Sequence, residues 1–113
     1  MKKNVKENFL KKIPVHKEGL AWSQDENALV TLKMQNRGIA NRLAQILLKK
    51  PKVSFIHLDE FGSFVWTSID GKRDIIAIGE LVRERFGDKA EPLYERLSQY
   101  IKTLQTNGFV TII

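Results

Sequence analysis

The clearest pattern of apolar and polar positions lies between residues 53 and 73. Residues 53–58 are β-branched and aromatic, which predicts a strand whose one face carries Val53, Phe55 and His57. Asp59 is a suitable N-cap, and apolar residues then recur at three- and four-residue spacing from Phe61 to Ile69, which predicts a helix. Gly71 can adopt the left-handed turn that ends a helix. The sequence therefore predicts a strand that leads directly into a short, aromatic-rich helix.

The same reasoning predicts two further helices downstream. Asp74 can cap the first of them, and Gly87 ends it. Pro92 has no N–H, so we expect it in the first turn of the next helix, which then begins near residues 89–90 and ends at Gly108. The apolar stripes of the three helices predict a core that includes Phe61, Phe64, Val65, Ile69, Ile78, Val82, Leu97 and Leu104.

The first half of the chain is predicted to begin a sheet. Residues 19–24 and 28–35 read as two strands around a polar turn, and alternation in the second predicts one buried face. Residues 39–50 have an apolar side, which predicts a helix ended by Pro51. Residues 109–113 are expected to be a terminal strand or an extended tail. The predicted fold class is α+β: a winged helix-turn-helix of three helices with an N-terminal three-stranded antiparallel sheet and an extra helix between strands 2 and 3.

Composition narrows the class of protein further. A chain of 113 residues predicts one domain, residues 13–113, preceded by a basic tail, residues 1–12. The absence of cysteine excludes disulfides and thiolate metal sites. No apolar run is long enough for a membrane span, and no apolar stretch of signal-peptide length follows the basic N-terminus, so we expect a cytoplasmic protein. The net charge is +6, but residues 1–52 carry +8 and residues 53–113 carry −2.

The sequence shows no constellation typical of catalysis. His16 and His57 are the only histidines, and neither has a second ligand at metal-binding spacing. Ser63 lacks the flanking pattern of a nucleophile elbow, and the turns at Gly71 and Gly87 lack the glycine-bracketed cradle of a P-loop. We therefore expect no catalytic residues, no metal site and no cofactor, and hence not an enzyme.

Two binding functions fit this fold class. DNA binding requires a positive recognition helix, but the third predicted helix carries charges that cancel, on Glu91, Glu95, Arg96 and Lys102. We therefore expect no specific nucleic-acid partner, and a winged-helix DNA-binding regulator is the alternative. Peptide binding requires an open strand edge, and the strand at residues 53–58 comes last in the predicted meander. That edge could instead be solvent-exposed or covered by residues 1–18.

An ordered set of short pieces carries a family resemblance: the strand 53–58, LDEFGSFVW at 58–66, IDGKR at 69–73, the stripe at Ile75 and Ile78, Phe86-Gly87, and residues 104–109. With these pieces, residues from about 50 onward resemble the PqqD family of pyrroloquinoline quinone biosynthesis, and more broadly the RiPP recognition elements that serve ribosomally made, modified peptides. Residues 19–35 look like the family's first two strands. Residues 36–52 are longer than the link usual in this family, and the basic N-terminal extension is also unusual.

The resemblance implies a function and a set of residues. Members of the family bind the leader of a precursor peptide along the third strand, against the third helix, and present it to a modifying enzyme, typically a radical SAM protein. They have no catalytic residues. The peptide-binding residues implied here are those of the strand and our choice of the adjoining helix face: Val53, Ser54, Phe55, Ile56, His57, Tyr94, Leu97 and Ile101.

Overall fold

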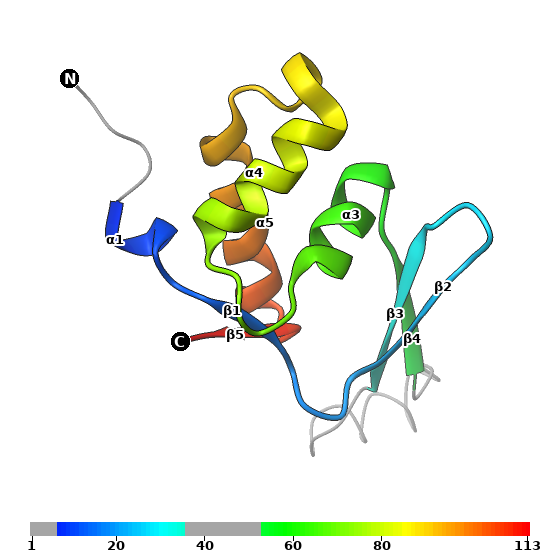
Figure 1. The fold of residues 1–113 in the computed structure, drawn as a ribbon. Helices are drawn as coiled ribbons and strands as arrows, with labels where there is room; N and C mark the ends of the chain where they lie inside the picture. The colour runs from blue at the N-terminus through cyan, green and yellow to red at the C-terminus, as the bar shows by residue number, and fades with distance from the viewer. Residues whose placement is uncertain (1–6, 36–52) are drawn as a thin grey trace.

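The computed structural model describes residues 7–35 and 53–113, and within them the chain forms helices and two antiparallel sheets (Figure 1). The expected α+β class is confirmed. In chain order the elements are α1 (Glu7–Leu10), β1 (Pro14–His16), β2 (Ala21–Gln24), β3 (Val30–Gln35), β4 (Val53–His57), α3 (Glu60–Ser68), α4 (Ile75–Phe86), the 3₁₀ helix η1 (Gly87–Ala90), α5 (Leu93–Thr106) and β5 (Val110–Ile112).

The larger sheet is an antiparallel meander with the strand order β2-β3-β4. In its register Leu32 pairs with Trp22 on one side and with Ile56 on the other. The smaller sheet joins β1 to β5, so that the segment before the meander pairs with the C-terminal strand. Helices α3, α4 and α5 lie on one side of the meander in Figure 1.

The predicted N-caps of α3 and α4 act as expected, whereas Gly71 does not end α3, because the helix already stops three residues earlier. The Asp59 carboxylate accepts a hydrogen bond of 2.8 Å from the Gly62 N–H at the start of α3. Asp74 caps α4 in the same way, through the Ala77 N–H at 2.8 Å. Gly87 ends α4 at a φ of +60°, a region that other residues adopt only at a cost in energy.

The core lies between the helices and the inner face of the meander. In β3 the predicted alternation is confirmed, because Val30 and Leu32 are buried while Lys33 is exposed. Trp66 of α3 is the largest of the fully buried side chains. Of the predicted core residues, six are buried and the two phenylalanines, Phe61 and Phe64, pack against the core while only partly buried. The main core also includes Ile75, Leu93, Ile101, Phe109 and Val110.

The structure differs from the sequence prediction at β1 and at the start of α5, and it does not test two other predictions. Strand β1 was missing from the sequence prediction, and Phe9 and Leu10 of the preceding helix pack against the core. Pro92 is the N-cap of α5 rather than a residue of its first turn, because the expected early start is the separate 3₁₀ helix η1. The helix predicted at residues 39–50 lies outside the described residues. The winged-helix arrangement of α3–α5 stays a prediction.

Candidate functional site

Strand β4 is an edge strand of the meander, as the sequence predicts. It pairs with β3 on one side, and no other strand of the described residues pairs with it on the other. Its five residues contain no proline, lysine or acidic residue, the side chains that often protect an exposed strand edge. The open side of β4 is therefore a place where an extended chain could add a strand.

One hydrogen bond fixes which residues of β4 face this open side. The N–H of Leu58, which follows β4, donates to the carbonyl oxygen of Val30 at 2.9 Å. Backbone groups of an antiparallel strand alternate between its two sides, so Ile56 and Ser54 also point their N–H and C=O groups toward β3. The same alternation points the backbone groups of Val53, Phe55 and His57 toward the open edge, and these residues could pair with an incoming chain.

The side chains of β4 alternate with the same period. Ile56 lies beside Leu32 on the inner face and packs against the core. Phe55 is on the outer face, beside Lys33 of β3, and 58% of its surface is exposed. The outer-face His57 ring is hydrogen-bonded through Nδ1 to the Thr31 hydroxyl at 2.9 Å. An added strand would therefore meet the exposed ring of Phe55 on one face of the sheet.

The C-terminal end of β4 is held to α3 by a buried hydroxyl. Ser63 Oγ accepts a hydrogen bond from the Val30 N–H at 2.8 Å and donates one to the Leu58 carbonyl oxygen at 3.3 Å. Val30 and Leu58 are neighbours in the continued register of β3 and β4. The serine hydroxyl thus replaces the last direct backbone bond of this strand pair, and it connects both strands to the first turn of α3.

Helix α5 approaches the start of α3 through two side chains that the sequence analysis did not select. The Arg96 guanidinium lies 4.5 Å from the centre of the Phe61 ring and donates to the Lys89 carbonyl oxygen at 2.8 Å. Tyr100 packs edge-on against the same Phe61 ring, with 6.0 Å between ring centres. Burial, with a smaller contribution from the Asp59 carboxylate, raises the pKa of Tyr100 to about 12. These contacts place one side of α5 against the start of α3, which begins three residues after the last residue of β4.

The three residues of α5 that the sequence analysis chose are not on this side. Leu97 and Ile101 have no exposed surface, so they belong to the core and cannot contact a peptide in this conformation. Tyr94 faces α4, where its hydroxyl donates to the Ile76 carbonyl oxygen at 3.2 Å. Two of the three chosen residues are therefore core residues, and the side of α5 that meets a peptide stays a prediction. The residues one position before each of this buried pair are Arg96, which is exposed, and Tyr100, which is half-buried.

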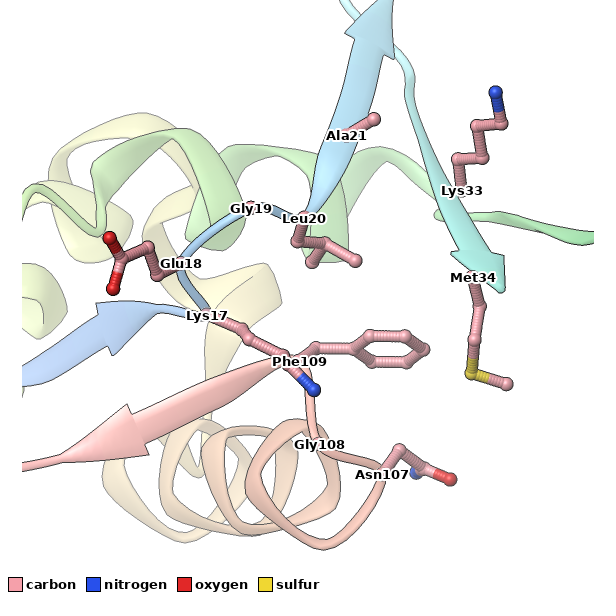
Figure 2. A pocket seen from close by; sticks show the side chains of 10 residues that line it. All are labelled: Lys17, Glu18, Gly19, Leu20, Ala21, Lys33, Met34, Asn107, Gly108 and Phe109. Atoms are coloured by element: carbon pink, nitrogen blue, oxygen red, sulfur yellow. The ribbon is translucent and has the colours of Figure 1, made fainter. Parts of the chain in front are cut away.

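A separate pocket lies at the other end of the meander. It has a volume of about 510 Å³ and contains apolar side chains from three segments, Leu20, Met34 and Phe109 (Figure 2). Lys17 and Lys33 also line it, and in Figure 2 Lys33 points away from the apolar centre. No residue of β4 is among the described residues that line this pocket, so it is distinct from the open strand edge.

Residues 7–35 and 53–113 contain neither a metal cluster nor a membrane span. No group of three or more metal-ligating side chains could hold an ion there. None of the helices in that part of the chain is both long and apolar enough to cross a membrane.

Comparison with known families shows a match. Residues 44–110 match the family described as coenzyme PQQ synthesis protein D (PqqD). The chain belongs to the PqqD family. The matched segment contains β4 and helices α3–α5, the elements that form the open edge and its surroundings, and it confirms the resemblance noted in the sequence. No curated protein and no solved structure gave a significant match.

Proposed function

We propose that this PqqD-family protein binds the leader of a ribosomally made precursor peptide by β-strand addition at the open edge of β4, and presents it to a modifying enzyme. The protein itself is non-catalytic in this proposal, and the enzyme is of the radical SAM type. The leader adds a fourth strand to the meander, next to Val53, Phe55 and His57. Ser54 and Ile56 hold β4 in place through their bonds to β3.

The observation that carries the proposal is the open edge of β4 within the matched segment. An edge strand offers a row of backbone donors and acceptors that an extended peptide can satisfy without regard to most of its side chains. The helix surface at Phe61, Arg96 and Tyr100 forms the other side of the proposed site, in place of the Leu97 and Ile101 expected from sequence. This surface is aromatic and cationic, and it lies where β4 passes into α3.

The alternative, sequence-specific DNA binding, has no comparable support. Arg96 is one of the two basic residues in α5, and its guanidinium is engaged with the Phe61 ring and the Lys89 carbonyl oxygen. A recognition helix needs arginine or lysine side chains that are free to reach base edges. Peptide binding is therefore the function that we propose.

Two proline substitutions test strand addition directly. Phe55→Pro removes an N–H that points to the open edge, so the fold should survive while an incoming strand loses a hydrogen bond and meets the proline ring. Ile56→Pro removes an N–H that bonds to β3, so it should disrupt the meander. Circular dichroism reports folding, and calorimetry reports binding of the leader encoded by a precursor gene next to this one.

We expect Phe55→Pro to keep the native spectrum and to lose leader binding, and Ile56→Pro to lose the native spectrum. Phe55→Ala is the matched control, because it keeps the backbone N–H at the same position and should bind measurably. If the folded Phe55→Pro protein binds the leader as tightly as the unmodified protein, strand addition at β4 is wrong.

A further inference from the structure

The Phe55 side chain is more exposed than that of any other aromatic residue in the described segments, and it lies on the proposed binding strand. We propose that Phe55 determines peptide specificity from the outer face of the meander, by contacting an aromatic side chain of the bound peptide. This inference rests on the proposed function, since it requires that a peptide pairs with β4. It assigns a role to the face of the sheet that points away from the core.

The position of Phe55 follows from the register of β4. Its backbone groups face the open edge, so an antiparallel peptide would place one residue in a hydrogen-bonded pair with it. Side chains of such a pair lie on the same face, with Cα atoms about 5.5 Å apart. The peptide residue paired with Phe55 would therefore place its side chain next to the exposed ring. The ring would lose water on its free side, and this contact stabilises the complex only if the peptide side chain is complementary.

The surroundings of the ring favour an aromatic partner. On the outer face Phe55 has Lys33 as its neighbour in β3, and His57 lies two residues along the strand. The peptide would lie two strand spacings from β3, roughly 9–10 Å, so the ring of Phe55 is a closer neighbour than the backbone that carries Lys33. Aromatic pairs across strands are among the favourable cross-strand contacts. The described positions on this face include no carboxylate: Ala21, Ser23, Thr31, Lys33, Val53, Phe55 and His57.

The inner face of the meander would favour a different kind of peptide side chain. Peptide side chains on that face would lie beside Ile56, which packs against the core. That environment accepts apolar side chains at alternate peptide positions. The aromatic residue that we propose falls between those positions, with opposite parity. A bound peptide would therefore show two superimposed patterns, an apolar one with period two and a single aromatic residue out of phase with it.

A selection from random linear peptides of twelve residues tests this inference on the full-length protein. The pool is selected in parallel against the unmodified protein and against Phe55→Ala, Phe55→Pro and Lys33→Ala. The unmodified protein and Lys33→Ala should enrich both patterns. Phe55→Ala should enrich the alternating apolar positions and lose the aromatic preference. Phe55→Pro should enrich neither, because it removes the backbone bond on which strand addition depends.

A double-mutant cycle between Phe55 and the aromatic residue of one selected peptide, measured as binding affinity, completes the test. Replacing its out-of-phase aromatic residue by alanine should weaken binding to the unmodified protein by about threefold to tenfold. The same peptide change should alter binding to Phe55→Ala by less than about twofold, because the partner ring is already absent. Circular dichroism of Phe55→Ala, an exposed position, controls for folding.

The outcomes separate this inference from the proposed function. If Phe55→Ala keeps the aromatic preference while Phe55→Pro abolishes binding, strand addition stands and the role of the Phe55 side chain is wrong. If an acidic preference appears instead and is lost in Lys33→Ala, Lys33 rather than Phe55 selects the peptide, and the inference fails. If Phe55→Pro enriches the same peptides as the unmodified protein, both proposals fail.

Discussion

The Ser63 hydroxyl accepts a hydrogen bond from the Val30 N–H at 2.8 Å, across 33 positions of sequence. Both residues are buried, so no water replaces this bond when it is removed. The same hydroxyl donates to the Leu58 carbonyl oxygen, and it therefore connects β3, the end of β4 and α3. The edge strand of the proposed site is positioned against the core by this one side chain as well as by its ladder to β3.

We predict that Ser63→Ala lowers the free energy of unfolding by about 1–3 kcal/mol, because it leaves the Val30 N–H buried without a partner. Denaturant unfolding measures the change. Ser68→Ala is the matched control in the same helix: the Ser68 hydroxyl donates to the Phe64 carbonyl oxygen within α3 and holds no strand. We expect a smaller loss there. Equal losses for the two variants would show that the strand contact has no special effect.

The unit formed by β4 and α3 could be predicted from the sequence because its signals are local. Asp59 and Gly71 lie within a few residues of the ends that they mark, and the change from strand to helix is visible in the spacing of apolar residues. Strand β1 could not be predicted in this way. It has three residues, and its partner Val110–Ile112 lies almost a hundred positions away, so its pairing depends on the complete fold.

The exposed side of α5 could not be predicted from the sequence, for a different reason. The apolar spacing of Leu97 and Ile101 marks the most hydrophobic stripe of α5, and that stripe forms the core. A peptide-facing stripe must instead lie beside it, partly exposed, as Tyr100 does. Sequence periodicity locates the buried side of a helix, but which exposed side approaches β4 depends on how α3 and α5 cross. The contacts of Phe61 with Arg96 and Tyr100 show which side of α5 approaches α3.

The second prediction concerns His16, whose ring stacks on Trp66 with 3.8 Å between ring centres. Burial lowers the pKa of His16 below its ordinary value of 6.5, although its hydrogen bond to the Trp66 carbonyl oxygen opposes this shift. As the pH falls through about 6.5, the unfolded chain binds a proton at this position before the folded protein does. Stability contributed by neutral His16 is therefore present above this pH and decreases below it.

Unfolding measured between pH 7.5 and about 5.5 should show stability decreasing toward low pH, in a range where most carboxylates stay ionised. His16→Gln should flatten this dependence. His57→Gln is the matched control, because it removes the other histidine, which is exposed, and should leave the dependence in place. A slope that persists unchanged in His16→Gln would assign it to another group.

The third prediction is that α5 does not read DNA bases. Fluorescence anisotropy with a random duplex pool should give weak binding that falls steeply with salt, because the net charge of +8 lies in residues 1–52. Removing residues 1–6, which include three lysines, should weaken this binding further. Arg96→Ala should leave it unchanged within about twofold if α5 makes no base contacts. Enrichment of a single site with nanomolar affinity would contradict the prediction.

The fourth prediction concerns Gly62, in the first turn of α3. Alanine normally stabilises a helix relative to glycine, by roughly 0.5–1 kcal/mol. Here a Cβ atom would overlap the hydroxyl of Tyr100 and lie 2.8 Å from its ring carbon Cζ, so the ring of the α5 residue would have to move. We expect Gly62→Ala to destabilise the protein by about 1–3 kcal/mol, the usual cost of overpacking.

The effect of Gly62→Ala on stability should change sign when the Tyr100 side chain is removed. In a Tyr100→Ala background the new methyl group has room, so Gly62→Ala should then stabilise the protein by the ordinary helix preference. The four proteins form a double-mutant cycle measured by denaturant unfolding, and the coupling should exceed 1 kcal/mol, as for residues in direct contact. Additive effects would mean that α5 does not approach α3 at Gly62. In that case Tyr100 would not lie beside the start of α3, and the helix side of the proposed peptide site would have to be sought elsewhere.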